Sequence, residues 1–458
     1  MLEKVFRIKE RGSNVRTEVI AGITTFMTMA YILAVNPIIL SGAKMDPNAV
    51  FFATAIAAGV VTIAMGLFVN FPIALAPGMG LNAYFAAVVA QGLMPSWQAA
   101  LAAVFISGII FIILTVTNIR QLLIVAVPNS LKKAITVGIG LFITFIGLKI
   151  SGLTIAFVEL LPGQFGGNME KIIGAGKGDL SGVEWGIKLG SVAHGPAVLA
   201  IIGLLIMGIL LVKRVKGALL WGILITTVVG IPLGQTNITG FKFSLPNFQN
   251  LAVGQLDFAG ALSAGILGVV LTFTFVELFD TFGTLVGTAG KAGLLDEHGN
   301  NPKIGKAMLV DAFGVSFGAL MGTSTVTSYV ESAAGIGEGG RTGLTSVTTG
   351  VLFLLALFLA PIFILIPGSA TGPALVLVGL LMASAVREID FEDLTEGLPA
   401  FLTLTLMPFT YNIANGIAAG ILFYTILKGV SGKAKEVHWL MWLLSLIIIG
   451  RYIFLGGE

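Results

Sequence analysis

The sequence contains no cysteine and only three histidines, and both shortages exclude classes of chemistry. Without cysteine, the chain cannot carry thiol catalysis, a disulfide framework, or a Cys-based zinc or iron–sulfur site. His194, His298 and His438 stand far apart, so there is no HExxH pattern and no multi-histidine metal site. We therefore expect neither a metal nor an organic cofactor.

Charged residues are scarce as well. They make up 11% of the 458 residues, whereas soluble domains carry about 25%, and the mean hydropathy is +0.98. Because so little polar surface cannot cover a chain of this size in water, the composition predicts an integral membrane protein in a lipid bilayer. The net charge of +3 gives no reason to expect a nucleic-acid partner.

The N-terminal segment, residues 1–16, carries five basic residues but lacks the apolar run and cleavage site of a signal peptide. Leu2, Val5, Phe6 and Ile8 are interspersed among these charges. This mixture predicts a short amphipathic segment on the cytoplasmic membrane surface.

Apolar stretches long enough to cross a bilayer recur along the chain, since a spanning helix needs about 20 apolar residues. The predicted unbroken spans are 17–40, 49–70, 98–118, 130–150, 195–212, 217–235, 262–289, 303–321, 342–366, 371–386, 397–411 and 414–429. Two further apolar segments, 72–91 and 322–338, are interrupted by Gly, and the first also by Pro. Counting both gives seven spans on each side of the polar stretch 236–257.

The positions of Lys and Arg support this count, because basic residues accumulate in cytoplasmic loops. Fourteen spans with a cytoplasmic N-terminus place most of the 26 basic residues inside. The same rule favours two short helices over one long helix in 397–429, with a break near 408–415. We expect residues 151–194 to form a Gly-rich external loop and 436–455 an interfacial helix, with a fifteenth span as the alternative.

The two interrupted segments are each third in their run of seven. Paired interrupted segments at corresponding positions are typical of transporters built from inverted repeats, whose site lies between half-helices near the bilayer midplane. The β-branched residues of 322–338 suit a short extended stretch that leads into a half-helix. The predicted fold is therefore all-α and polytopic, with short extended stretches in spans 3 and 10.

Glycine is abundant, with 60 of 458 residues, roughly twice the usual share of about 7%. Part of this excess suits close helix packing. Gly78, Gly80, Gly322, Gly335 and Gly337, however, fall in the interrupted segments. There they allow the backbone to leave helical geometry, which at membrane depth is tolerated only inside protein or along a cavity.

Four carboxylates fall inside predicted spans: Glu277, Asp280, Asp311 and Glu331. Each costs roughly 2.5–3.5 kcal/mol at the membrane centre on insertion scales, so each indicates a functional site. Glu277 and Asp280 share one helical face with several threonines, which favours a stripe facing substrate or protons over a polar packing seam. Within this stripe we assign Asp280 the structural role.

The polar residues of the interrupted segments have alternatives of their own. Glu331 falls in the first turn of a predicted half-helix, where free amide groups can bind a ligand; the alternative is a carboxylate that only caps this helix. Asn82 offers an amide that both donates and accepts, and a simple kink would not explain it beside a second glycine.

Four stretches of the sequence resemble one known family: AGITTFMTMAYILAVNP, APGMGLNAYFA, FVELFDTFGTLVG and TSYVESAAGIGEGGRTG. They resemble the AzgA-like purine permeases, the adenine/guanine/hypoxanthine branch of the nucleobase:cation symporter-2, or nucleobase–ascorbate transporter, family. The resemblance implies 14 spans in a 7+7 inverted repeat. It also implies a core domain (17–118 and 262–366) and a gate domain (130–235 and 371–429).

The resemblance also implies site residues. It assigns substrate binding to Glu331 with the backbone at Tyr329 and Val330, to Glu277, and to further residues of spans 1 and 3, namely Thr28, Asn82 and Ala83. Glu277, Asp280 and Asp311 are the acids assigned to proton coupling or structure. Many relatives have Asp where Glu277 stands, and the extra methylene changes the distance to the substrate.

The resulting expectation is a multi-pass protein of the cell membrane, with both termini cytoplasmic, that forms a homodimer. It would import purine nucleobases by proton symport with alternating access, with guanine and hypoxanthine as substrates and adenine as a further candidate. The alternative within transport is an anion carrier of the sulfate/bicarbonate type on the same architecture. Two carboxylates that converge on the site disfavour an anionic substrate. An enzyme would need a nucleophile–base pair, and the sequence shows none.

Overall fold

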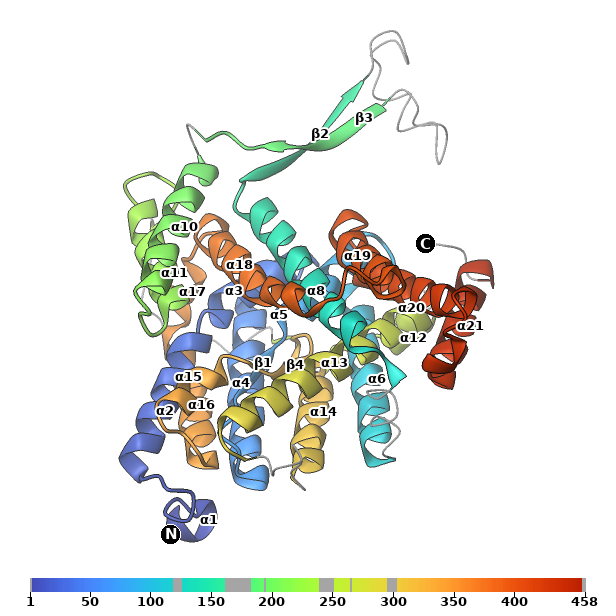
Figure 1. Ribbon diagram of the computed structural model, residues 1–458. Helices are drawn as coiled ribbons and strands as arrows, with labels where there is room; N and C mark the ends of the chain where they lie inside the picture. The colour runs from blue at the N-terminus through green and yellow to red at the C-terminus, as the bar shows by residue number, and fades with distance from the viewer. Residues whose placement is uncertain are drawn as a thin grey trace.

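The computed structural model describes residues 2–117, 126–160, 183–192, 195–238, 251–263, 266–294 and 303–454. Parts of the predicted external loop and of the polar stretch 236–257 lie outside these ranges, as do His194 and His298. Helices dominate the described residues (Figure 1).

Within those ranges, nine helices are long and apolar enough to cross a membrane. They are Val15–Ser41, Pro47–Val69, Trp97–Val116, Asn129–Ile150, Leu267–Lys291, Ile304–Met321, Gly343–Ile364, Gly368–Glu388 and Ile413–Val430. Shorter apolar helices cover Met79–Ala90, Pro196–Val212, Ala218–Gly230 and Trp439–Gly450. The membrane character is thereby confirmed, while the count of 14 spans stays a prediction.

Local signals set the helix boundaries. Helix α4 (Pro47–Ala64) begins where Asp46 accepts a hydrogen bond from the Asn48 amide and Pro47 occupies the first turn, a position that needs no N–H donor. Helix α6 (Trp97–Val116) begins where Ser96 accepts from the Ala99 amide. Each cap satisfies an amide group that the first turn leaves without a partner.

One predicted span is divided, and one predicted break between two spans is present. The divided span, predicted at 17–40, consists of α2 (Val15–Met29) and α3 (Ile32–Ser41), which meet at Ala30 and Tyr31. The predicted break within 397–429 is confirmed, because α19 (Leu394–Phe409) ends before α20 (Ile413–Val430) begins.

The two interrupted segments pair with each other at the centre of the molecule. Strand β1 (Leu75–Pro77) runs antiparallel to β4 (Val326–Ser328), with Ala76 opposite Thr327. Helix α5 (Met79–Ala90) follows β1, and the short α15 (Ser332–Gly337) follows β4. The two half-helices are therefore held by a common two-stranded ribbon.

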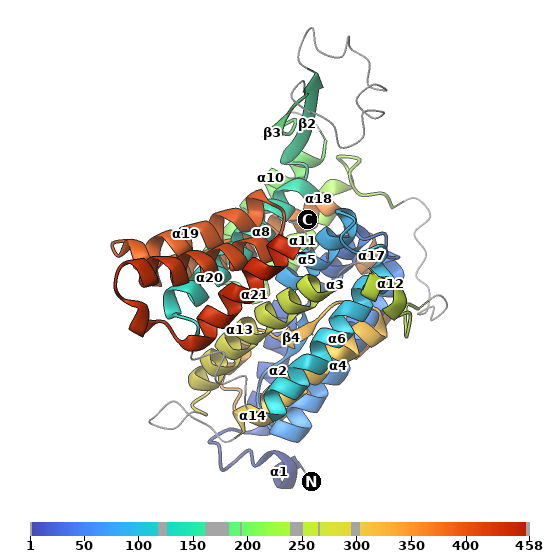
Figure 2. The same ribbon diagram turned by 90° about the vertical axis from the view of Figure 1, so that its right-hand side faces the viewer.

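The spanning helices pack in two groups (Figure 2). In the first group, α4 packs on α14 (Ile304–Met321) and α16 (Gly343–Leu355), and α6 packs on α14. In the second, α8 (Asn129–Ile150) packs on α18 (Gly368–Ala383), α19 and α20. Helix α13 (Leu267–Lys291) contacts members of both groups, such as α6 and α20.

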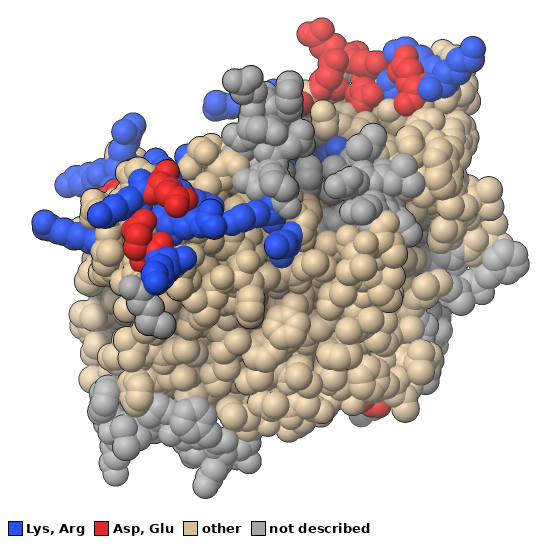
Figure 3. Space-filling view, turned by 90° about the horizontal axis from the view of Figure 1, so that it is seen from below, with Lys and Arg blue, Asp and Glu red and all other residues tan. Residues whose placement is uncertain are grey.

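The remaining elements lie at the periphery. Helix α1 (Leu2–Phe6) and the β2–β3 hairpin (Thr154–Leu160 with Val183–Leu189) are at opposite ends of the helical body (Figure 1). Helices α10 (Pro196–Val212) and α11 (Ala218–Gly230) pack together, and α21 (Trp439–Phe454) packs on α20. Seen from below, charged side chains gather in the upper part of the view, and a broad uncharged surface fills most of the remainder (Figure 3).

Candidate functional site

A cavity of about 620 Å³ lies where the β1–β4 ribbon and α13 face α8 and α18. From the first group of helices and the ribbon, its lining includes Thr28, Gly78, Gly80, Asp280, Thr327, Tyr329, Val330 and Glu331. From the second group it includes Lys133, Thr136, Ile139, Ile143, Val378, Leu381, Met382, Ser384 and Ala385. One wall is therefore rich in polar groups, and the opposite wall is mostly aliphatic.

The ribbon forms the polar wall. Its backbone continues beyond the paired strands, because the Gly78 amide donates to the Thr325 carbonyl at 3.0 Å and the Tyr329 amide donates to the Ala74 carbonyl at 3.0 Å. The Tyr329 hydroxyl also donates to the Pro77 carbonyl. A Cβ atom at Gly78 would lie 2.9 Å from Cγ2 of Thr327, so glycine allows the strands to approach this closely.

Glu331 lies at the junction of β4 and α15 and is held from span 1. Its carboxylate accepts a hydrogen bond of 2.7 Å from the Tyr31 hydroxyl, and the Thr28 hydroxyl lies 3.5 Å from the Glu331 carbonyl. The Glu331 side chain makes no capping bond to α15. The structure thus favours the cavity-facing interpretation of Glu331 over the helix-cap alternative.

Asp311 on α14 holds the ribbon in place through hydrogen bonds. Its carboxylate accepts from the Ser328 amide at 2.7 Å, from the Ser328 hydroxyl at 2.6 Å and from the Thr281 hydroxyl at 2.7 Å. The Thr281 hydroxyl also lies 3.0 Å from that of Thr327. Asp311 is fully buried and therefore ties α13, α14 and β4 together.

The positions of the two acids of α13 differ from the roles that the sequence analysis assigns to them, namely a structural role for Asp280 and substrate binding for Glu277. Asp280 lines the cavity, whereas Glu277 is fully buried and is not part of the lining. Within the described residues, neither carboxylate oxygen of Glu277 has a hydrogen-bond partner, although Thr325 and Thr327 are close neighbours. In this conformation it is Asp280, and not Glu277, that reaches the cavity.

The structure does not place Asn82 or Ala83 at the cavity. The Asn82 amide nitrogen donates to Asn36 at 2.6 Å, and its oxygen accepts from the Ser324 hydroxyl. Asn36 in turn donates to Thr54 at 2.7 Å and to Thr323 at 2.9 Å. Since both ends of its amide are used in this buried network, Asn82 connects spans 1, 3 and 10 and does not face a substrate here.

The glycines of the breaks have distinct local roles. Gly322 ends α14 with a φ of 94°, a conformation that side chains rarely adopt. Gly335 on α15 packs directly against Ala21 and Thr25 of α2, so a side chain there would separate these helices. Gly80 borders the cavity beside Ile139.

Sequence reasoning missed Tyr31, Lys133 and Thr136. A tyrosine inside an apolar span is a usable signal, because its buried hydroxyl needs a partner. Lys133 forms a 2.6 Å ion pair with Glu388 at the mouth of the cavity. That pairing joins residues far apart in the sequence, so no local pattern indicates it.

Solved structures of other membrane proteins show which fold this chain adopts. The transmembrane domain of a cyanobacterial bicarbonate transporter, BicA, matches with a TM-score of 0.63 and 15% identity, covering 89% of this chain and 97% of that chain. The anion transporter SLC26A9 matches with a TM-score of 0.61 and 14% identity, covering 94% of this chain and 68% of that chain. The likeness at these identities shows the fold, which is the 7+7 membrane transporter fold that the interrupted spans predict.

The chain belongs to the permease family, here its nucleobase–ascorbate transporter members, because the family model matches residues 16–166 and 171–419. A putative permease of Methanocaldococcus jannaschii is 47% identical, covering 100% of this chain and 99% of the relative. The adenine permease AdeP of Escherichia coli is 41% identical, with coverages of 100% and 97%. The guanine/hypoxanthine permease PbuG of Bacillus subtilis is 42% identical, with coverages of 99% and 100%. The protein is thus a transporter and not an enzyme.

Proposed function

We propose that this permease imports purine nucleobases by proton symport, with guanine and hypoxanthine as substrates and adenine as a further candidate. The observation that carries the proposal is the cavity in which Asp280 and Glu331 face an aliphatic wall. Relatives named as adenine and guanine/hypoxanthine permeases support the same substrate class.

The chemistry of the cavity suits a purine. A purine edge presents N–H donors next to carbonyl or ring-nitrogen acceptors; carboxylates accept from the former, and backbone amides at the start of a half-helix donate to the latter. The aliphatic side chains of Ile139, Val378 and Met382 offer a surface for the flat ring. Sites built from a few matched polar groups in an apolar pocket select ligands by these hydrogen bonds.

Proton coupling is assigned to the acids on α13. Glu277 lies close enough to Asp280 and Asp311 to interact electrostatically with both. Among the described residues no hydrogen bond holds the carboxylate oxygens of Glu277, whereas the Asp311 carboxylate accepts three. We propose that Glu277 exchanges a proton as the substrate binds and leaves.

Alternating access would move the helices of the first group, the core, against those of the second, the gate. In the predicted orientation, the mouth of the cavity is cytoplasmic, since Lys133, Ser384 and Ala385 lie at the cytoplasmic ends of α8 and α18. This conformation would then be the inward-facing one. A homodimer in the cell membrane, with both termini cytoplasmic, completes the proposal.

Uptake of labelled hypoxanthine, with adenine, guanine, xanthine and uracil as competitors, tests the substrate class. The proposal expects competition by adenine or guanine, faster uptake at the lower of two external pH values, and loss of accumulation with a protonophore. Effective competition by uracil or xanthine alone would contradict the purine assignment. For the coupling role, retained pH-dependent accumulation in Glu277→Gln would assign the proton elsewhere.

An anion carrier is the second candidate, because the fold matches bicarbonate and anion transporters and Lys133 lines the cavity mouth. The pairing of Lys133 with Glu388 and the two cavity carboxylates disfavour it. Uptake of labelled bicarbonate or sulfate that hypoxanthine does not inhibit would favour this candidate.

A further inference from the structure

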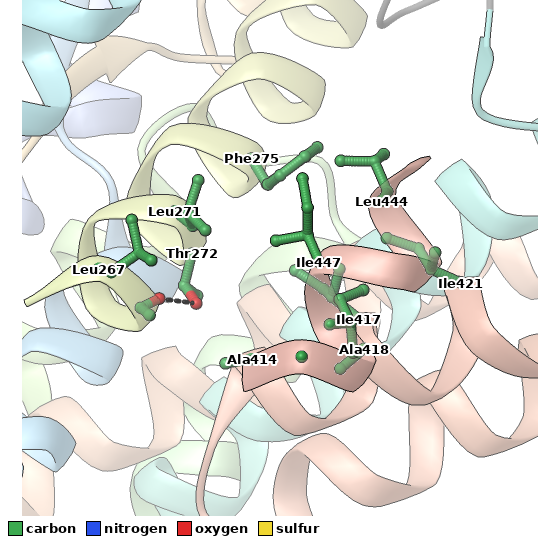
Figure 4. Close-up of a pocket in the computed structure, with 13 residues that line it drawn as sticks. Leu267, Leu271, Thr272, Phe275, Ala414, Ile417, Ala418, Ile421, Leu444 and Ile447 are labelled. Carbon is green, nitrogen blue, oxygen red and sulfur yellow. Dashed lines mark hydrogen bonds between the residues drawn. The ribbon is translucent and has the colours of Figure 1, made fainter. Parts of the chain in front are cut away.

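A second hollow, separate from the polar cavity, lies between α13, α20 and α21 (Figure 4). This apolar crevice has a volume of about 270 Å³. Its lining comprises Leu267, Gly268, Leu271, Thr272, Phe275, Ala414, Ile417, Ala418, Ile421, Leu444, Ile447, Ile448 and Gly450. The proposed function assigns no role to these residues.

Among the residues that line the crevice in the described part of the chain, none is charged and none offers a free polar side chain. Thr272 provides the only side-chain hydroxyl of the lining, and it donates to the Gly268 carbonyl at 2.8 Å (Figure 4). A cavity of about 150 Å³ lined by aliphatic and aromatic side chains stays free of water and binds benzene. The larger crevice therefore suits an apolar occupant and not water or a nucleobase.

The crevice is continuous with the surface that faces lipid. Leu267 and Ile447 are exposed at its edge, whereas Ile417 and Ile421 are buried at its base. In a membrane protein, an exposed aliphatic surface of spanning helices is covered by acyl chains. An acyl chain can therefore enter sideways from the bilayer along the aliphatic side chains that line the crevice.

The ends of the crevice indicate where a lipid headgroup would lie. The Tyr452 hydroxyl donates to the Asn415 side chain at 3.1 Å, and Asn415 is next to Ala414 in the lining. Tyrosine is enriched at membrane–water interfaces, where its ring is apolar and its hydroxyl is hydrated. The pair marks a polar boundary at the N-terminal end of α20, from which the crevice extends inward.

We propose that this crevice binds one acyl chain of a membrane phospholipid, from the leaflet at the N-terminal ends of α13 and α20. The chain fills the seam between α13 and α20. Because α20 belongs to the group of helices around α8, whereas α13 carries Asp280, the bound lipid lies between the two parts of the protein that border the polar cavity.

Photolabelling tests this assignment with the full chain. The protein is reconstituted into phosphatidylethanolamine/phosphatidylglycerol vesicles that contain a small fraction of phospholipid with a mid-chain diazirine, irradiated, and digested for mass spectrometry. We expect adducts at buried crevice residues such as Ile417, Ile421 and Leu444. Adducts confined to freely exposed residues such as Leu446 and Ile453 would overturn the proposal.

A filling substitution supplies the matched comparison. Ala418→Phe places a ring in the crevice, and crevice adducts should fall by about tenfold or more because the ring removes most of the free volume. Leu446→Phe adds a ring on α21 at a position that is 71% exposed and outside the lining, and should leave the crevice adducts unchanged. Unchanged crevice labelling in a monodisperse Ala418→Phe protein would refute the assignment. If that variant aggregates, Ala418→Leu replaces it in the same comparison.

The competing occupant is a second copy of this chain. The natural sequence has no cysteine, so Leu444→Cys provides a single thiol inside the crevice. We expect no disulfide between two copies of this variant on oxidation in native membranes, because an acyl chain and not another protein covers the site. A disulfide-linked dimer formed in high yield would assign the crevice to a protein interface.

Discussion

The contact between Tyr31 and Glu331 offers the sharpest test at the scale of single residues. Tyr31→Phe removes the hydroxyl that donates to the Glu331 carboxylate at 2.7 Å and keeps the ring. Hydrogen bonds to charged groups contribute about 1.5–3 kcal/mol, so we expect the KM for the purine to rise by roughly tenfold or more. Radiolabelled uptake measures this change.

A matched control for this substitution is Tyr452→Phe, because Tyr452 is also a hydrogen-bonded tyrosine but lies outside the cavity lining. It should leave the KM unchanged. Equal KM values for Tyr31→Phe and the natural protein would show that the Tyr31 hydroxyl does not position Glu331 for substrate.

Asp311 and Asp280 are both intramembrane acids, but their surroundings predict opposite phenotypes. Asp311→Ala leaves three donors from Ser328 and Thr281 without their acceptor, each at a cost of about 1–3 kcal/mol when buried. We expect a clear drop in the melting temperature of the purified protein. Asp280→Asn should instead lower uptake and change the melting temperature little, and the reverse pattern would contradict the structural role of Asp311.

The sequence predicts which residues are acids of the site but not which acid faces the cavity. Glu277 and Asp280 share one helical face by periodicity, and the structure places only Asp280 in the lining. The choice depends on how α13 is rotated against β4, which is a tertiary property. The structural role of Asn82 is likewise not predictable from the sequence, because its partners Asn36 and Ser324 come from distant segments.

At the scale of elements, the β1–β4 ribbon depends on close approach at Gly78. Gly78→Ala places a methyl group 2.9 Å from Cγ2 of Thr327, so the Thr327 side chain or its strand must shift, and such overpacking costs about 1–3 kcal/mol. We expect uptake to fall sharply while the protein still inserts in the membrane. Uptake and the amount of protein in the membrane fraction are measured together.

Two further variants show whether this clash is the cause. In Gly78→Ala/Thr327→Ser the opposing methyl group is removed and the hydroxyl that lies near Thr281 is kept, so uptake should recover substantially. Gly337→Ala adds a methyl group where no atom lies within 4 Å and should be silent. An inactive double variant beside an active Gly337→Ala would mean that Gly78 is needed for another reason.

The elements themselves are largely predictable, because each is specified by local signals. The interrupted spans follow from Pro77, Gly78 and Gly322, and the break between α19 and α20 follows from the distribution of lysines. The pairing of β1 with β4 is different, since it joins segments about 250 residues apart. The inverted-repeat pattern predicts that the two interrupted segments occupy corresponding positions in the two halves. It does not predict that they pair in one ribbon.

At the scale of the whole molecule, the two groups of helices are linked at a point remote from the cavity mouth. The Gln91 side chain, just after α5, donates to the Tyr411 carbonyl between α19 and α20 at 2.9 Å. Tyr411 has a φ of 53°, which is rare for a bulky residue, and its ring packs on Phe142 and Phe145. We interpret this contact as part of the closure on the side opposite the mouth.

The accessibility of the cavity from the two sides tests this interpretation, and the cysteine-free sequence makes the experiment direct. Thr136→Cys places a thiol in the cavity lining, whereas Thr144→Cys lies two turns further along α8 and outside the lining. A membrane-impermeant maleimide should modify the thiol at position 136 mainly from the side of Lys133, and a bound purine should slow the reaction. Adding Gln91→Leu removes the contact to Tyr411, so modification from the opposite side should increase, while the reactivity at position 144 stays unchanged. Equal modification of position 136 from both sides in the natural background would argue against a cavity that opens to one side at a time.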